Sequence, residues 1–395
     1  MASVSQKIDG LLAKQSFIRK MFEEGNRLRA IHGADKVFDF SLGNPNLEPP
    51  SALQDALADL VTHPQLGMHG YMSNAGYPDV RAAVAAYLSE EQRVALTGDY
   101  VVMTVGAGGA LNVVFKTVLD PGDEVITPAP YFAEYNFYVD NHGGTCLHVP
   151  ATPDFDLDID AIASAITART RVVLINSPNN PTGRVYGKET LAALANLLRE
   201  KSQEMGRTIY LLSDEPYRKI TYGGVEVPPV LSAYESSLLV TSYSKDLSLA
   251  GERIGYVAVN PATPEAEKLM NGLIFANRVL GFVNAPALMQ KAVARVQGMG
   301  VDITPYQRNR DLLYKELTEA GFTVPHPDGA FYLFPKSPLE DDVAFVAEMA
   351  ESLVLVVPGS GFGGPGYFRI AYCVSPQTVD GALPAFRAVG KKYFG

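Results

Sequence analysis

The sequence predicts an α/β protein, with a large domain built on a mainly parallel mixed sheet flanked by helices and a smaller α+β domain. Between residues 100 and 260, apolar runs of strand length alternate with stretches of helical periodicity. Beyond about residue 284 the pattern changes to longer helices with a few short strands. A chain of 395 residues is also too long for one compact core. We therefore expect a large domain over residues 46–283 and a small domain that joins residues 1–45 to residues 284–395.

The region before the first long strand predicts a helix, a short strand and two turns. Apolar residues from Gln15 to Ile31 recur at roughly helical spacing with charges between them, so we expect an amphipathic helix that docks on another surface. A short strand from Phe38 breaks into a turn at Gly43. Turn-forming residues dominate a later segment around Tyr71. Taken alone, both turns are also compatible with plain loops.

A glycine-rich turn follows the apolar strand expected at residues 100–105. It reads Gly106-Ala107-Gly108-Gly109 and opens a helix. Free backbone N–H groups at a helix N-terminus form an anion site, and glycines let a phosphate approach the backbone closely. The pattern is neither a dinucleotide fingerprint nor a Walker P-loop. A tight packing turn explains it about equally well.

Polar side chains follow three successive apolar strands of the predicted sheet. Further strands are expected at residues 124–127, 145–149, 171–176, 209–213, 237–241 and 254–259. Asn180 follows the third of these, Asp214 and Tyr217 follow the fourth, and Lys245 follows the fifth. Because ligands gather beyond the carboxyl ends of parallel strands, we expect these side chains to meet the Gly106 turn at one edge of the sheet.

The stretch from Ser242 to Gly255 contains one lysine among small hydroxyl residues, and an arginine eight positions later. A lysine at the end of a buried strand is costly as a charge, and burial lowers its pKa toward that of a neutral amine that attacks a carbonyl. Ser242 and Arg253 suit a phosphate. Together with Lys245 they indicate a phosphorylated carbonyl cofactor, of which pyridoxal phosphate is the obvious case. The alternative is a surface lysine and arginine in a loop.

The C-terminal part contains one arginine inside an apolar strand. Helices are expected at residues 264–280, 286–297, 305–319, 343–351 and 376–391, with short strands among them. Arg369 interrupts the apolar run from Phe368 to Tyr372. A buried arginine is expensive unless it is paired with an anion. Arg369 is therefore expected to pair with an anion.

Composition and charge exclude several classes of function. The net charge is −10 without a basic cluster, which argues against a nucleic-acid partner. No apolar run reaches membrane-spanning length, and the first residues lack the apolar region of a signal peptide. The two cysteines make no disulfide framework, so a cytoplasmic location is the default. The six histidines show no metal-ligand spacing, and we expect no metal site.

The combination of these motifs resembles the class I and II aminotransferases of fold type I, which depend on pyridoxal 5'-phosphate, and within them an aspartate-aminotransferase-like group of bacterial enzymes. The resemblance spans nearly the whole chain, and order and spacing match as well. It rests on Asn179-Asn180-Pro181-Thr182-Gly183, Ser213-Asp214-Glu215-Pro216-Tyr217, Ser242-Tyr243-Ser244-Lys245, Arg253-Ile254-Gly255 and Phe368-Arg369-Ile370.

The resemblance implies catalytic roles for residues at the strand ends. Lys245 is similar to the family's Schiff-base lysine, which also moves the proton between the substrate α-carbon and the cofactor. Asp214 matches the carboxylate that pairs with the pyridinium nitrogen, although in isolation it could be a turn or cap residue. Tyr217 and Asn180 match donors to the cofactor phenolate, and could otherwise be a core aromatic and a turn residue before proline.

The resemblance also implies how phosphate, ring and substrate are held. The phosphate contacts would be the backbone of Ala107 and Gly108, the side chains of Ser242 and Arg253, and Tyr71 from the neighbouring subunit of a homodimer with composite sites. Many relatives carry Ser, Thr or Lys at the glycine turn, so a side-chain contact there is in doubt. The ring and substrate contacts would be Phe132, which could equally be a core residue, with Asn180, Gly43 and the α-carboxylate clamp Arg369.

Three functions stay open at the level of sequence. The first is an aminotransferase that moves an amino group between an amino acid, aspartate-like or other, and a 2-oxo acid by a ping-pong Schiff-base mechanism. The second is a β-eliminating lyase of the same fold, since the same motifs serve both reactions. The third is a ligand-sensing relative without catalysis. The amino donor and the residue that recognises its side chain are not identified.

Overall fold

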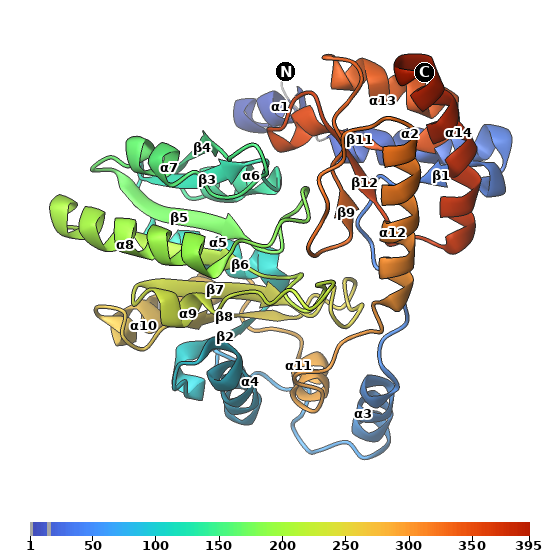
Figure 1. Ribbon diagram of the computed structural model, residues 1–395. Helices are drawn as coiled ribbons and strands as arrows, with labels where there is room; N and C mark the ends of the chain where they lie inside the picture. Colours follow the sequence, from blue (N-terminus) through green and yellow to red (C-terminus); the bar gives the residue numbers. More distant parts are fainter. Residues whose placement is uncertain (1–2, 14–16) are drawn as a thin grey trace.

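The computed structural model describes residues 3–13 and 17–395. Its centre is a seven-stranded sheet in the order β2-β8-β7-β6-β5-β3-β4 (Figure 1). The strands are β2 (Val101–Thr104), β3 (Glu124–Ala129), β4 (Thr145–Pro150), β5 (Thr170–Asn176), β6 (Tyr210–Asp214), β7 (Ser237–Ser242) and β8 (Gly255–Val259).

Strand direction brings the predicted polar residues to one edge of this sheet. All neighbouring pairs are parallel except those made by β8, which is antiparallel to both β7 and β2. Because the chain direction reverses twice across β8, β2 runs in the same direction as β7. The C-terminal ends of β2, β5, β6 and β7 therefore meet at one edge. The predicted fold class, a mainly parallel mixed sheet flanked by helices, is confirmed.

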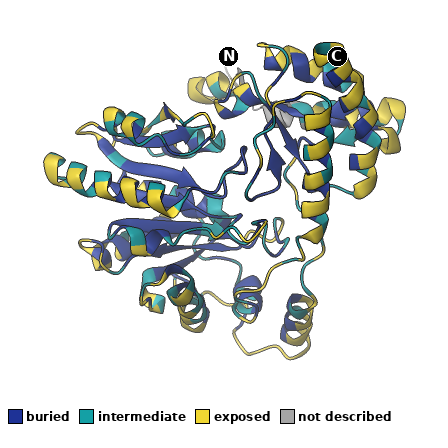
Figure 2. Cartoon of the chain, viewed as in Figure 1, coloured by how far each residue is buried: buried dark blue, intermediate teal, exposed yellow. Residues whose placement is uncertain are grey.

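Both faces of the sheet are buried under helices, which explains why its strands read as continuous apolar runs. In β5, Val172 and Leu174 belong to the core on one face, whereas Val173 and Ile175 belong to the core on the other. The first face is covered by α5 (Gly106–Val118), α6 (Glu134–Asp140) and α10 (Ala266–Val279). The second is covered by α3 (Ser51–Thr62), α4 (Pro78–Gln92), α7 (Ile159–Ala165), α8 (Lys188–Met205), α9 (Val230–Ala233) and α11 (Ala287–Ala294). Figure 2 shows the strands as buried and the outer helix faces as exposed.

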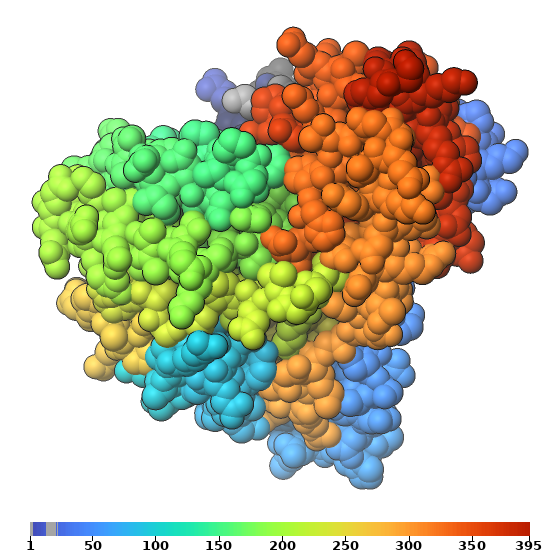
Figure 3. All heavy atoms as spheres, in the orientation of Figure 1, coloured from blue at the N-terminus to red at the C-terminus, as the bar shows by residue number. Residues whose placement is uncertain are grey.

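The C-terminal residues form a second core beside the carboxyl edge of the sheet. A three-stranded antiparallel sheet has the order β11-β12-β9, with β9 (Tyr332–Leu333), β11 (Val357–Pro358) and β12 (Phe368–Ala371). Its helices are α12 (Thr304–Glu319), α13 (Asp342–Glu351) and α14 (Pro376–Phe394). Phe331, Phe345 and Phe386 lie at the centre of this core. In Figure 3 the orange and red C-terminal segment lies to one side of the green and yellow sheet domain.

The N-terminal segment is tied to this second core. Strand β1 (Phe38–Asp39) pairs in parallel with β10 (Val354–Leu355), so residues from the two ends of the chain lie side by side. The amphipathic helix predicted at Gln15–Ile31 corresponds to α2 (Phe17–His32), preceded by α1 (Gln6–Ala13). Gln15 and Ser16 lie outside the described residues. Short 3-10 turns are found at η1 (Ala34–Lys36), η2 (Gly98–Tyr100) and η3 (Gly359–Phe362).

Helix α11 bears on where the two domains divide. It packs against α3 and α4, and its Met289 and Val293 belong to a core of the large sheet. The next helix, α12, contributes Tyr306 and Leu313 to the small core. The predicted boundary at residue 284 is not tested directly. We propose instead that the boundary falls between Val296 and α12, because Val296 packs in the core of the large sheet whereas α12 packs in the small core.

Candidate active site

A cavity of about 650 Å³ lies at the carboxyl edge of the large sheet, where it meets the small domain. Residues from the N-terminal segment, the strand ends of the sheet and β12 line it together. All the site residues predicted from the sequence lie in this lining except Tyr71: Gly43, Ala107, Gly108, Phe132, Asn180, Asp214, Tyr217, Ser242, Lys245, Arg253 and Arg369. The fold therefore brings together groups that are far apart in sequence.

Lys245 follows β7 and reaches across the cavity toward the N-terminal segment. Its Nζ donates a hydrogen bond of 2.7 Å to the carbonyl oxygen of Gly43. Burial is the main reason that the pKa of Lys245 is lowered to about 8; Cys373 opposes this shift, whereas the cations Arg369 and Arg253 contribute to it. A substantial fraction of the side chain is therefore a neutral amine near physiological pH, as a nucleophile or a proton acceptor requires.

Asp214 ends β6 as a buried carboxylate with one satisfied oxygen. Its Oδ2 accepts a hydrogen bond of 2.7 Å from the hydroxyl of Tyr135, whereas Oδ1 has no partner among the described residues. Burial raises the pKa of Asp214 to about 7, the Tyr135 hydrogen bond opposes this, and Glu215 adds to it. An unpaired buried carboxylate oxygen is costly on its own. Its position in the cavity lining fits a cationic partner such as a protonated ring nitrogen.

Arg369 is a buried cation without a carboxylate partner among the described residues. Its Nη1 donates to Oδ1 of Asn180 at 3.0 Å and its Nη2 donates to the carbonyl of Ser41 at 2.7 Å, while Nε is unpaired. The guanidinium also lies over two aromatic rings: its Cζ is 4.6 Å from the centroid of the Tyr332 ring and 4.5 Å from that of the Phe362 ring. These contacts orient the planar group but leave its charge uncompensated, so the site is prepared for an anion.

The glycine turn and Arg253 form the anion-binding end of the cavity. Helix α5 begins at Gly106, so the N–H groups of Ala107 and Gly108 lie in its first turn. Gly106 has φ +76°, and a Cβ there would come within 3.0 Å of the Arg253 guanidinium. Arg253 itself donates to the carbonyl of Ala250 at 2.9 Å. Because Gly106 has no side chain, the Arg253 guanidinium can lie against the N-terminus of α5. The guanidinium and the helix N-terminus both favour a phosphate.

The space next to Gly108 is taken by the side chain of Tyr138. A Cβ at this position would come within 3.1 Å of the Tyr138 hydroxyl, which occupies the space above the turn. The Tyr138 hydroxyl also has no hydrogen-bond partner among the described side chains or backbone. The Tyr138 phenol from α6 therefore occupies the space that a side chain at Gly108 would need.

Three aromatic residues of the lining were not identified from the sequence. Tyr135 and Tyr138 are on α6 and Tyr332 is on β9, where its hydroxyl is 2.8 Å from that of Tyr217. The ring of Phe132 meets that of Tyr135 edge to face, with centroids 5.5 Å apart. The spacing of three between Tyr135 and Tyr138 was the available signal, because residues three apart share one face of a helix; Phe132 precedes α6.

Tyr71 lies outside the cavity. It is in the loop between α3 and α4, and its side chain is 93% exposed. A role within its own subunit's cavity therefore has no support. The predicted role toward a neighbouring subunit stays a prediction.

The fold and the cavity define a class of enzyme. A seven-stranded mixed sheet with a lysine, an aspartate and a helix-start anion site at its carboxyl edge belongs to fold type I enzymes that use pyridoxal phosphate. The family described as "Aminotransferase class I and II" matches residues 35–386. The chain belongs to this family, and it is an aminotransferase with pyridoxal 5'-phosphate as its cofactor.

Named relatives agree with this assignment. The chain is 35% identical over 366 residues to an "Aspartate/prephenate aminotransferase" of Thermus thermophilus, which covers 90% of this chain and 91% of the relative. It is 43% identical to the solved structure of an aminotransferase from Eubacterium rectale, with a TM-score of 0.96 and full coverage of both chains. An alanine aminotransferase structure from Pyrococcus furiosus is 28% identical, with a TM-score of 0.87, 98% of this chain covered and 100% of that chain. These names favour amino-group transfer over elimination or ligand sensing.

None of the helices in residues 3–13 and 17–395 has the length and apolar character needed to span a membrane. No group of three or more metal-ligating side chains gathers in that part of the chain.

Proposed function

We propose that this aminotransferase binds the α-carboxylate of an amino acid at Arg369 and transfers its amino group to a 2-oxo acid. The observation that supports it most strongly is the buried Arg369 guanidinium, which has an unpaired Nε and lines the same cavity as the Lys245 amine. A carboxylate at Arg369 compensates the buried charge and fixes the α-carbon within the cavity.

The residues present fit pyridoxal phosphate. The phosphate would be held by the N–H groups of Ala107 and Gly108 with Ser242 and Arg253, and the ring by Phe132, Asp214, Tyr217 and Asn180. When bound, this cofactor supplies an electron sink for the bond that breaks at the substrate α-carbon. Asp214 would hold a proton on the ring nitrogen, because the ring's positive charge compensates its unpaired Oδ1.

Lys245 would move the proton. The pKa of Lys245 is about 8, so its Nζ is mainly neutral at a pH above that value. The hydrogen bond to the Gly43 carbonyl orients Nζ. With the cofactor bound, Nζ would accept the proton from the substrate α-carbon and donate it again during amino-group transfer. The hydroxyls of Tyr217 and Tyr332 are hydrogen-bonded to each other, and this pair would lie at the edge of the cofactor ring.

The charges that line the cavity bear on the amino donor. Its described cations are Lys245, Arg253 and Arg369, and the proposed roles above occupy all three. Glu134 is also in the lining, and burial raises its pKa. A donor with a second carboxylate would find no further cation in the described lining of one subunit. We therefore propose that donors with uncharged side chains are preferred.

A second candidate donor is aspartate, which the printed name of the Thermus thermophilus relative favours. Its distal carboxylate would need a cation from the neighbouring subunit. A panel of amino acids that includes alanine, leucine, phenylalanine, aspartate and glutamate tests this, with conversion of the cofactor to its amine form followed by absorbance. Higher kcat/KM for the uncharged donors supports the first candidate, whereas a preference for aspartate rejects it.

A homodimer with composite sites is part of the proposal. Large apolar side chains are exposed on α10 and near Tyr71: Leu66, Tyr71, Phe275 and Val279. Helix α1 also exposes Ile8 and Leu12. Exposed apolar surface of this kind favours association with a second copy. A cytoplasmic location is likewise proposed, supported by two free thiols, Cys146 and Cys373.

A further inference from the structure

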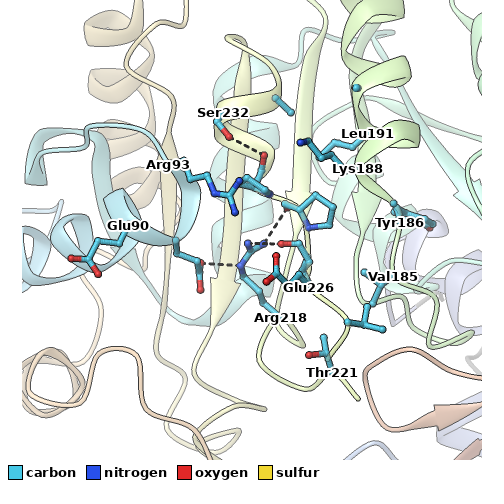
Figure 4. A pocket seen from close by; sticks show the side chains of 18 of the residues that line it. Glu90, Arg93, Val185, Tyr186, Lys188, Leu191, Arg218, Thr221, Glu226 and Ser232 are labelled. Carbon is cyan, nitrogen blue, oxygen red and sulfur yellow. Dashed lines mark hydrogen bonds and ion pairs between the residues drawn. The ribbon is translucent and has the colours of Figure 1, made fainter. Parts of the chain in front are cut away.

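A second cavity, of about 770 Å³, lies on the face of the large domain that carries α4, α8 and α9. Its walls are the end of α4, the start of α8, the loop from Arg218 to Pro229 and α9 (Figure 4). No described residue lines both this cavity and the one that contains Lys245. Nothing in the proposed transamination uses it, although the two volumes are similar.

The chemistry of its walls is that of a site for a small organic molecule. Part of the lining is apolar and comes from two segments, with Val185 and Leu191 from one and Val227, Pro228 and Pro229 from the other. Ligand sites typically combine such surface with a small number of polar groups that fix orientation.

Two cations in the lining have no anion of their own. Arg93 and Lys188 make no hydrogen bond or ion pair with any described residue, whereas Arg199 and Arg218 are both fully engaged. In Figure 4 the side chains of Arg93 and Lys188 extend from opposite walls toward the middle of the cavity, and the carboxylate of Glu90 points away from it. Arg93 and Lys188 are both exposed, and the Glu226 carboxylate of the same lining has no partner among the described residues either. Two converging unpaired cations favour an anion between them, provided that it stays clear of Glu226.

The floor of the cavity is connected to the active site through Arg218. Its Nε pairs with Glu91 at 3.0 Å, and its Nη2 donates to the Val227 carbonyl of the cavity wall at 2.9 Å. Its Nη1 pairs with Glu215 at 2.7 Å, and Glu215 directly follows Asp214. The same arginine thus holds the wall of one cavity and the neighbour of the carboxylate in the other.

Glu215 is fixed on every side. Its backbone N–H donates to the Val240 carbonyl at 2.9 Å, its carbonyl accepts from the Thr241 hydroxyl at 2.9 Å, and its Oε1 accepts from Ser213 at 2.7 Å. The charge of Glu215 also helps to raise the pKa of Asp214, after burial. Because Glu215 is held in place by these bonds, a movement of Arg218 changes the electrostatic field that Arg218 and Glu215 produce at Asp214.

We propose that this second cavity binds a small organic carboxylate with an apolar body, and that its occupancy alters Asp214 through Arg218 and Glu215. The ligand carboxylate lies between Arg93 and Lys188, and its body lies on the Val227–Pro229 wall. The coupling rests on the proposed role of Asp214, whereas the binding does not.

Binding is tested with holoenzyme and 4-phenylbutyrate, followed by calorimetry, with 4-phenylbutylamine as the probe of reversed charge. Arg93→Glu and Lys188→Glu should each weaken binding of the carboxylate at least tenfold, whereas Lys391→Glu, at an exposed lysine of α14, should not. Neither cavity variant touches the catalytic cavity, so both should keep the basal kcat. Equal binding by all four proteins would place the carboxylate at Arg369 instead, and that result or no binding overturns the proposal.

Coupling is tested by the visible absorbance of the bound cofactor across pH. Saturating 4-phenylbutyrate should shift its midpoint in the wild type and in Lys391→Glu, and not in Lys188→Glu. Arg218→Lys, which keeps the charge but not the fork of contacts, should still bind the probe while the shift is lost. A shift that persists in Lys188→Glu, or binding without any shift, rejects the coupling. Failure of the amino-acid panel would leave these spectra interpretable, because they need only the bound cofactor.

Discussion

The Tyr135 hydroxyl donates a 2.7 Å hydrogen bond to one oxygen of Asp214, and the other oxygen of that carboxylate has no partner among the described residues. The two residues come from different elements, α6 and the end of β6. The bond opposes the rise in the pKa of Asp214 that burial causes. Tyr135 therefore acts as a positioning residue that favours the charged carboxylate.

Replacing Tyr135 with Phe removes this bond. A hydrogen bond to a charged group contributes about 1.5–3 kcal/mol, so kcat should fall about tenfold or more. The pH midpoint of the cofactor absorbance should fall, because a carboxylate that is harder to ionise stabilises the ring proton less. Tyr138→Phe is the matched control, since it removes a hydroxyl from the same helix that does not bond Asp214. An identical spectral titration in Tyr135→Phe and wild type would contradict the role.

Asp214 should make the cofactor-free protein less stable as pH rises. Its folded pKa is raised to about 7 from an ordinary 3.8, so between these values the folded state binds more protons than the unfolded state. Stability is present at low pH and is lost as pH rises through 7. The wild type should lose roughly 3 kcal/mol relative to Asp214→Asn between pH 5 and pH 8.

Urea unfolding of both cofactor-free proteins at the two pH values measures this difference, since other groups cancel between them. A wild type that gains stability relative to Asp214→Asn over that interval would mean that the carboxylate is stabilised as an anion. Asp214→Asn should also lower kcat by several orders of magnitude, because an amide does not hold the ring proton.

Lys245 should be the residue that borohydride links to the cofactor. The pKa of about 8 means that the neutral amine increases as pH rises through this value. Capture of pyridoxal phosphate by the cofactor-free protein should accelerate from pH 6.5 to 8.5 and then level off. Peptide mapping after reduction identifies the labelled lysine. A label on another lysine, or a rate that is flat across this interval, would remove Lys245 from the role.

Arg369→Lys should lower kcat/KM for every amino acid in the panel by about a hundredfold, because a lysine keeps the charge but loses the planar fork. Arg310→Lys is a suitable control. Arg310 is also buried and lies over the Tyr222 ring, but it does not line the catalytic cavity. It should affect stability more than KM. A loss confined to acidic donors would show that Arg369 binds a distal carboxylate.

The composite site can be tested with hybrid dimers of Lys245→Ala and Tyr71→Ala subunits. If Tyr71 acts on the neighbouring subunit, one site in the hybrid carries both defects and the other carries none, so activity returns to about half of the normal value. The control hybrid pairs Lys245→Ala with Asp214→Ala. These two residues line the same cavity of one chain, so every site in the control is damaged. An inactive Tyr71 hybrid would show that Tyr71 does not act across the interface.

The sequence was sufficient to predict the sheet and the residues at its edge. Apolar runs with both faces buried identify strands, and parallel strands bring their carboxyl ends together, so Asp214 and Lys245 could be placed without coordinates. We expected a mixed sheet, but the sequence did not show that β8 would be its antiparallel strand. Its neighbours are set by pairing across the whole domain, which no local pattern encodes.

The contacts between domains could not be predicted. Arg369 bonds Asn180, and Lys245 bonds Gly43, through contacts that exist only once the small domain has docked. Tyr135 was missed for a related reason, since an aromatic on a short helix packs into a core as readily as it lines a site. Its bond to Asp214 depends on how α6 lies over β6.

The cavity that holds Lys245 takes residues from Gly43 near one end of the chain and from Arg369 near the other. During synthesis, the groups proposed for the phosphate and ring emerge from the ribosome long before the strand that carries Arg369. A chain that stops early contains a lysine and an anion site, but it has no group at Arg369 to select an amino acid. We therefore expect chemistry on substrates to wait until the strand that carries Arg369 has been made, so that fragments without it consume amino acids poorly.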